Sequence, residues 1–120
     1  MRFLIVDDNA SFLEASRALL ERHGHNVVGV ASDGVAACKQ AAELTPDVAL
    51  VDIDLGDESG FDPARQLADS PSGAHVKTIL LSAHPEGDFA ELVAESPAAG
   101  FIAKSDLSVR SIAELLDGGR

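Results

Sequence analysis

Short, nearly continuous apolar runs alternate with longer amphipathic stretches along the whole chain. The apolar runs at residues 3–6, 27–31, 48–51, 78–81 and 101–103 have the length of buried strands. Between them, apolar side chains recur every three or four residues, which is the spacing of one helical face. Strands that are each followed by a helix predict a parallel sheet covered by helices on both faces.

The amphipathic stretches predict five helices, at residues 10–23, 33–44, 61–68, 88–95 and 107–116. Gly24 and the Thr45-Pro46 pair end the first two of them. Residues 52–60 are polar and contain glycine, so a loop is expected there. The last helix is expected to turn four positions inward, at Val109, Ile112, Ala113 and Leu116.

Composition narrows the class of protein. The chain has 120 residues, which predicts a single domain over residues 1–120. Its 20 acidic and 9 basic side chains give a net charge of -11, which disfavours direct binding to nucleic acid. Cys38 is the only cysteine, so no internal disulfide can form. The apolar runs are too short for a signal peptide or a membrane span, and a cytoplasmic location is expected.

Polar side chains with possible chemistry follow four of the five predicted strands. Asp7 and Asp8 follow the first strand, Asp52 the third, Ser82 the fourth and Lys104 the fifth. Ligands of open parallel sheets bind beyond the carboxyl ends of the strands, where the strand order reverses. We therefore expect these side chains to meet at one edge of the sheet, where Asp54 also follows Asp52 by two residues.

Three carboxylates crowded together repel one another unless a cation lies between them, and Mg2+ prefers oxygen ligands. Lys104 and Ser82 would add a positive charge and a hydroxyl, which completes a set able to accept a phosphoryl group. Each of these residues could also have a purely structural role without any chemistry. Asp8 or Asn9 could cap a helix, Asp52 and Ser82 could lie in turns, and Lys104 could be a solvated surface side chain.

The chain resembles the receiver domains of bacterial response regulators over essentially its whole length. The resemblance rests on four short segments in order, at residues 4–9, 51–60, 80–83 and 100–104. It implies a five-stranded doubly wound flavodoxin-like sheet of order 2-1-3-4-5, the order that receiver proteins exemplify. The segment from Ala103 to Ser108 is most similar to receivers of nitrate-response-type transcription regulators.

The resemblance also implies roles for individual residues. Asp52 would be the phosphoacceptor, and Mg2+ would be bound by the side chains of Asp7, Asp8 and Asp52 and by the backbone carbonyl of Asp54. Lys104 would pair with the phosphoryl group. The remaining roles are switching, by Ser82 and Phe101, and tuning of dephosphorylation, by Asp54 and His84.

The resemblance implies partners as well. The phosphoryl donor would be a histidine kinase or a histidine phosphotransfer protein. The surface formed by the fourth helix, the fifth strand and the last helix would switch to control an output. A homodimer could form through the same surface. No membrane partner is implied. Ser105 stands where the family commonly has proline, which puts the usual cis peptide after Lys104 in question.

Two other functions compete with this interpretation. Asp52-Ile53-Asp54 after a buried strand resembles the nucleophile motif of haloacid-dehalogenase-type phosphatases, which are Mg2+-dependent enzymes. Those enzymes place this motif on the first strand and their paired acids downstream, whereas here the paired acids lie upstream. A receiver-like module that binds partners without being phosphorylated is expected to lack an acceptor, a metal-binding acid or the lysine, and this chain has all three.

Overall fold

A five-stranded parallel sheet forms the centre of the molecule. The computed structural model describes residues 1–55, 58, 59, 65, 76–83, 91, 94 and 98–116. The strands of the main sheet are β1 (Arg2–Val6), β2 (Asn26–Ala31), β3 (Val48–Asp52), β6 (Lys77–Ser82) and β7 (Gly100–Ala103). They pair in parallel in the order β2-β1-β3-β6-β7. Counted among themselves, the strands follow the order 2-1-3-4-5, which confirms the predicted doubly wound fold.

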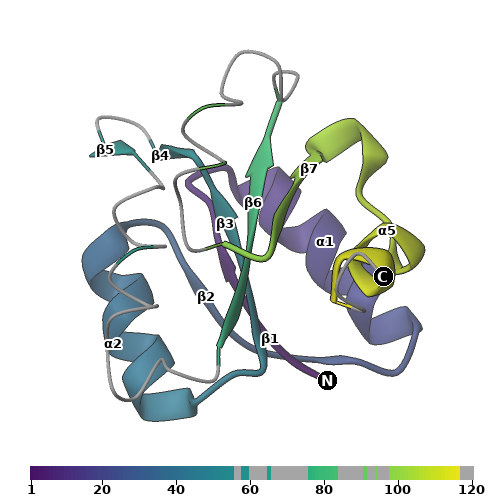
Figure 1. Ribbon diagram of the computed structural model, residues 1–120. Coiled ribbons are helices and arrows are strands. Elements are labelled where there is room, and N and C mark those ends of the chain that lie inside the picture. The colour runs from purple at the N-terminus through teal and green to yellow at the C-terminus, as the bar shows by residue number, and fades with distance from the viewer. Residues whose placement is uncertain are drawn as a thin grey trace.

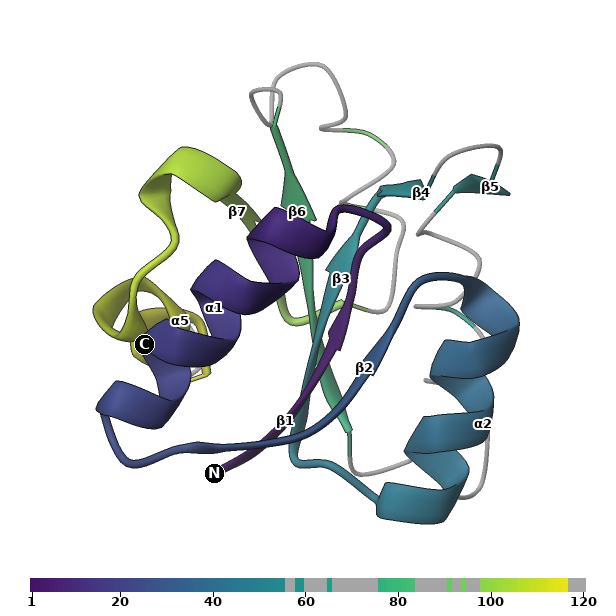
Figure 2. The same cartoon turned by 180° about the vertical axis from the view of Figure 1, so that it is seen from behind.

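Helices cover both faces of this sheet. The helices α1 (Ala10–Arg22) and α5 (Val109–Leu116) lie on one face, and α2 (Gly34–Leu44) lies on the other (Figures 1 and 2). The helices predicted at 61–68 and 88–95 lie outside the described residues, apart from three helical positions, Arg65, Glu91 and Ala94. In the part of the chain that the structure describes, no helix combines the length and apolarity needed to cross a bilayer.

Local capping explains where α1 and α2 begin. The Asn9 side chain accepts a hydrogen bond from the Phe12 amide at 3.1 Å, and Asp33 accepts one from the Ala36 amide at 2.8 Å. Each bond satisfies one of the amides that a helix leaves free in its first turn. Asp8 is therefore not needed as the cap of α1, and its carboxylate remains available at the sheet edge.

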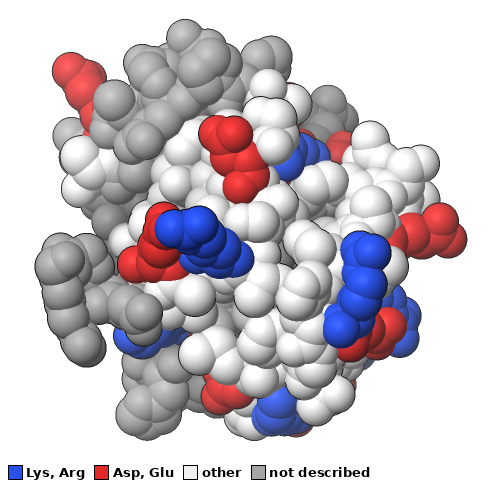
Figure 3. Space-filling view, turned by 90° about the vertical axis from the view of Figure 1, so that its right-hand side faces the viewer, with Lys and Arg blue, Asp and Glu red and all other residues white. Residues whose placement is uncertain are grey.

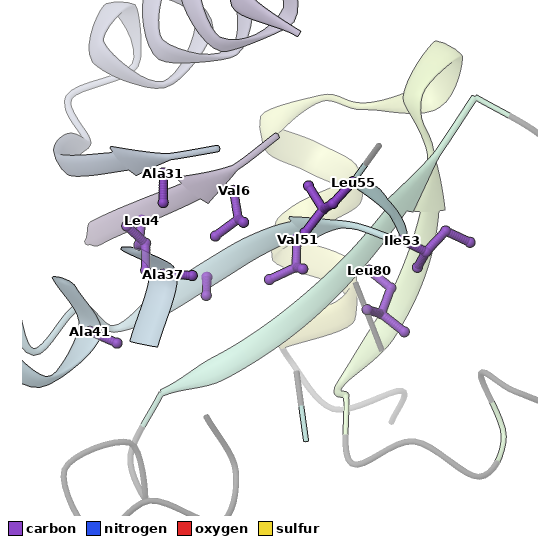
Figure 4. Packing of buried hydrophobic residues seen from close by; sticks show 10 residues of the cluster. Leu4, Val6, Ala31, Ala37, Ala41, Val51, Ile53, Leu55 and Leu80 are labelled. Carbon is purple, nitrogen blue, oxygen red and sulfur yellow. The ribbon is translucent and has the colours of Figure 1, made fainter. Parts of the chain in front are cut away.

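The alternation of side chains along the strands divides the core into two clusters. Leu4, Val51 and Leu80 point toward α2, where they pack with Ala37 and Ala41 (Figure 4). Residues one position away along the same strands point to the opposite face, under α1 and α5; they include Phe3, Ile5, Leu50, Ile79 and Leu81. Side chains along a strand alternate with a period of two residues. This alternation determines on which face of the sheet each strand-end residue lies.

One predicted loop contains regular structure. Two short strands, β4 (Asp54–Leu55) and β5 (Glu58–Ser59), pair antiparallel within the segment expected to be a loop. Residues 52–60 are mostly polar, but Leu55 among them is buried in the α2-side cluster. After a bend at Ile53, the chain therefore forms a second short strand instead of a loop.

The last helix is shorter than predicted, and three of its four predicted inward residues, Val109, Ile112 and Leu116, are confirmed in contact with the core. A 3-10 turn at Lys104–Asp106 precedes it, and Ser108 caps it by accepting a hydrogen bond from the Ser111 amide at 3.0 Å. Ala113 was expected to face the core but is exposed, whereas Leu115 is partly buried against the core. The Lys104–Ser105 peptide bond is trans, as are the others in the described residues.

Candidate functional site

The pairing of β1 with β3 places two carboxylates side by side. Val6 is in register with Val51, so Asp7 and Asp52, which follow them, are neighbours at the carboxyl edge of the sheet. Both lie on the face covered by α1 and α5, because they continue the alternation that places Ile5 on that face. Asp7 is 0% exposed and Asp52 is 3% exposed, so both carboxylates are nearly removed from water.

Lys104 reaches these carboxylates from the edge strand. It directly follows β7, and β6 lies between β7 and β3. Its Nζ lies 2.6 Å from Asp7 Oδ2 and 3.1 Å from Asp52 Oδ2. Only a long side chain can cross the end of β6 in this way, and the 18% exposure of the lysine side chain shows that the ion pair is largely buried. Such pairs depend on both partners, because either one left alone is a buried, uncompensated charge.

Backbone amides bind the other oxygen of each carboxylate. The Asn9 amide donates to Asp7 Oδ1 at 2.8 Å, and the Asp54 amide donates to Asp52 Oδ1 at 3.0 Å. Both donors lie two residues after the aspartate, so each strand end folds back on its own carboxylate. The orientation of both acids is therefore set by the backbone on one side and by Lys104 on the other.

Burial and charge act in opposite directions on the protonation of this cluster. Burial raises the pKa of Asp52, and the hydrogen bonds from the Asp54 amide and Lys104 only partly offset it. Burial by itself would lower the pKa of Lys104, but its contacts with Asp7 and Asp52 outweigh that and raise the pKa. The lysine ammonium is therefore the more firmly held of the two charges.

Three acids at this edge fit a divalent cation. One carboxylate oxygen from each of Asp7, Asp8 and Asp52 can lie within 4.8 Å of the others. Asp7 Oδ2 is buried and close to Lys104 without the alignment of a hydrogen bond, and no other described residue donates one to it. An oxygen of this kind suits a hard cation such as Mg2+, which prefers carboxylate, carbonyl and water oxygens. Six residues line the pocket beside it: Asp8, Asn9, Asp52, Asp54, Ala83 and Lys104.

The remaining predicted residues are more scattered. Ser82 is fully buried at the end of β6, in register with Ala103. Phe101 is partly buried against the α2-side cluster, on the face of the sheet opposite Asp52. Asp54 is exposed and lines the pocket. His84 lies outside the described residues.

Sequence reasoning missed one neighbour of the site. The Phe12 ring lies with its centroid 4.3 Å from Lys104 Nζ. The spacing of apolar residues in this helix places Phe12 on its inward face, but it says nothing of which polar side chain the ring meets. No local signal in the sequence marks this contact, because it depends on how α1 packs over the end of β7.

Comparisons with known proteins place the chain in a family. The family described as "Response regulator receiver domain" matches residues 3–115. The transcription regulator of virulence factors BvgA from Bordetella pertussis is 30% identical over 105 residues, which cover 88% of this chain and 49% of BvgA. A Pseudomonas aeruginosa transcriptional regulator is 30% identical over 115 residues, covering 96% of this chain and 53% of that protein. The chain thus spans about half the length of these relatives.

A solved structure has a similar backbone. The crystal structure of a LuxR-family two-component response regulator from Aurantimonas sp. SI85-9A1 superposes with a TM-score of 0.85 at 30% identity. The match covers 98% of this chain and 85% of that one.

Proposed function

Because the chain belongs to the response regulator receiver domain family, we propose that residues 1–120 form one phosphoacceptor domain of a two-component phosphorelay. Asp52 is the proposed acceptor. The observation that carries this proposal is its position: its carboxylate lies 3.1 Å from Lys104 Nζ and shares a cation-binding cluster with Asp7 and Asp8. The proposed donor is a histidine kinase or a histidine phosphotransfer protein.

In the proposed reaction, a carboxylate oxygen of Asp52 attacks phosphorus. The phosphorus–nitrogen bond of the donor phosphohistidine breaks, and the imidazole nitrogen keeps the electron pair. Side chains of Asp7, Asp8 and Asp52 and the backbone carbonyl of Asp54 would hold Mg2+, which neutralises the developing charge of the phosphoryl group when it is bound. Lys104 would pair with a phosphoryl oxygen, and the Asp54 amide keeps the Asp52 carboxylate oriented.

We further propose that phosphorylation is transmitted through Ser82 and Phe101. These two side chains extend the α2-facing side of adjacent strands, because Leu80 pairs with Phe101 and Ser82 with Ala103. The output surface would comprise the helix predicted at 88–95, β7 and α5, and it could also join two copies of the chain. Asp54 and His84 are the proposed positions that tune dephosphorylation. A cytoplasmic location, without direct binding to nucleic acid or membrane, fits this role.

The test is intact-mass spectrometry after incubation with acetyl phosphate and Mg2+. We expect a gain of one phosphoryl mass, no gain in EDTA and no gain in Asp52→Asn. Asp47→Asn is a matched control, because Asp47 is exposed and bonds to the Arg2 amide far from the site. An adduct at full yield in Asp52→Asn would contradict the assignment. Steady phosphate release from a phosphomonoester would instead favour a phosphatase.

A further inference from the structure

Lys104 has an aromatic neighbour in addition to its two carboxylates. Asp7 Oδ2 and Asp52 Oδ2 lie 2.6 and 3.1 Å from its Nζ, and the Phe12 ring centroid lies 4.3 Å from the same atom. An ammonium at this distance from an aromatic ring is attracted by the negative face of the ring. The lysine charge is therefore contacted by two anions and by a π surface.

We propose that Phe12 is a positioning residue that holds the Lys104 ammonium against Asp7 and Asp52. A lysine has four flexible methylene groups and a strongly hydrated charge, so its ammonium is not placed by its own backbone. A ring beside Nζ excludes water from one side of the charge and limits its motion. The inference deepens the proposed function, because Lys104 is the residue proposed to meet the phosphoryl group.

Phe12 is itself held rigidly enough to act in this way. Its amide bonds to the Asn9 side chain at the start of α1, and its ring packs against the core cluster beneath α1 and α5. The Asn9 amide in turn bonds to Asp7 at 2.8 Å. The segment 7–12 therefore contains both the carboxylate of Asp7 and the ring of Phe12, which contact Lys104. Because the two are joined by a short, hydrogen-bonded stretch of chain, their positions around the ammonium are fixed together.

The ring is required because of its charge distribution and not only because of its size. Leucine at this position would fill much of the same apolar space but has no π face, whereas tyrosine keeps the face. Phe12→Leu should therefore loosen Lys104, and Phe12→Tyr should not.

A double-mutant cycle tests the coupling without any phosphorylation. Unfolding of the wild type, Phe12→Leu, Lys104→Met and the double variant would be measured by urea denaturation in EDTA. We expect Phe12→Leu to raise the unfolding equilibrium constant about 2- to 30-fold more when Lys104 is present than when it is methionine. Leu13→Val is the packing control, because Leu13 packs against the same cluster and should show the same effect in both backgrounds. Equal effects of Phe12→Leu in the two backgrounds would overturn the proposal.

A spectroscopic readout covers the case in which Lys104→Met does not fold. Ring currents shift protons that lie over an aromatic face, so the ε-methylene protons of Lys104 should move upfield in the wild type and in Phe12→Tyr. They should return toward random-coil positions in Phe12→Leu. Unchanged lysine shifts in Phe12→Leu would also overturn the proposal.

A final measurement separates this inference from the proposed function. With acetyl phosphate and Mg2+, Phe12→Leu should form the Asp52 adduct several-fold more slowly than the wild type, and Phe12→Tyr at nearly the wild-type rate. Absence of any adduct in the wild type would refute phosphorylation while leaving the coupling measured in EDTA intact. A normal rate in Phe12→Leu would show that Phe12 does not position Lys104 for this reaction.

Discussion

At the scale of single residues, the candidate site is a balance between two buried negative charges and one positive charge. Asp7 and Asp52 are almost completely buried. One oxygen of each carboxylate accepts a hydrogen bond from a backbone amide, and the other lies near Lys104. Bringing such charges out of water costs free energy, which only close partners offset. Changes to any one of the three should therefore alter stability as well as function.

Removal of the lysine charge should destabilise the metal-free protein. Lys104→Met leaves Asp7 and Asp52 buried beside each other without a cation, and we expect a loss of about 3 kcal/mol of unfolding free energy. Mg2+ should restore much of this loss by replacing the missing charge. Urea denaturation in EDTA and in Mg2+ measures both effects, with Lys39→Met on the exposed side of α2 as the control. Equal losses in the two variants would show that the ion pairs contribute little.

Removal of the acceptor charge should have the opposite effect. The pKa of Asp52 is raised from 3.8 by burial, so the folded protein binds this proton more tightly than the unfolded chain does. Stability therefore falls as pH rises from 3.8 through the raised pKa, and the ionised carboxylate opposes folding above it. Asp52→Asn should be more stable than the wild type at neutral pH in EDTA, with the difference shrinking at low pH. Thermal melts from pH 3 to 8 test this, and a difference that grows on acidification would contradict it.

At the scale of elements, α5 depends on its contact with the edge strand. Eight residues are too few for a stable isolated helix, so tertiary packing must hold α5 in place. Ile112 is buried, and Leu115 lies directly over Gly100 of β7, where a Cβ would approach its Cδ2 to 2.6 Å. The glycine therefore permits the close approach of α5 to β7, within the proposed output surface.

The substitution Gly100→Ala should push this helix away from the strand. The new methyl group would meet three atoms of the Leu115 side chain, and we expect a loss of about 1–3 kcal/mol in unfolding free energy. Leu115→Ala also removes packing, but the double variant should lose less than the sum of the two, because the methyl group then has space. Chemical denaturation of the four proteins gives the coupling, and simple additivity would argue against this contact.

At the scale of the whole molecule, part of the charge on the surface over α1 and α5 lies in exposed ion pairs. On this side of the molecule, basic and acidic groups lie next to one another at several places, other acidic groups stand alone, and uncharged atoms cover much of the rest (Figure 3). The two helices that cover this side carry two ion pairs, Arg17–Glu21 in α1 and Arg110–Glu114 in α5, each at 3.3 Å and largely exposed. Exposed pairs of this kind contribute little to stability, so neither pair is expected to matter much for the fold.

A phosphoryl mimic should reveal whether the site communicates with a distant surface. Beryllofluoride with Mg2+ is expected to shift the backbone amide resonances of Glu91, Phe101 and Arg110 as well as those around Asp52. The physical reason is that Phe101 neighbours Ser82 across β6 and β7, so a movement of Ser82 would alter its packing. Asp52→Asn is the control that should abolish the distant shifts. Shifts confined to the loops around Asp52 and Ser82 would show that binding does not drive a switch.

Periodicity and strand-end position determined much of this protein from sequence alone. The five apolar runs correspond to the strands of the main sheet within one residue at each end, and their alternation with helices indicated a parallel sheet. The rule that ligands collect at the carboxyl ends of parallel strands singled out Asp7, Asp52 and Lys104, which the structure brings together. These inferences succeed because backbone period and strand polarity are properties of the chain itself.

Tertiary structure decided what depends on how elements pack. Only the folded chain shows that Asn9 and not Asp8 caps α1, that Leu55 continues the backbone into the β4–β5 pair, and that Leu115 replaces Ala113 on the inner side of α5. The Phe12–Lys104 contact belongs to the same class. Each is an encounter between side chains from different elements or a choice between adjacent polar residues. Its outcome is set by the distance and rotation of a helix on the sheet, which no local pattern encodes.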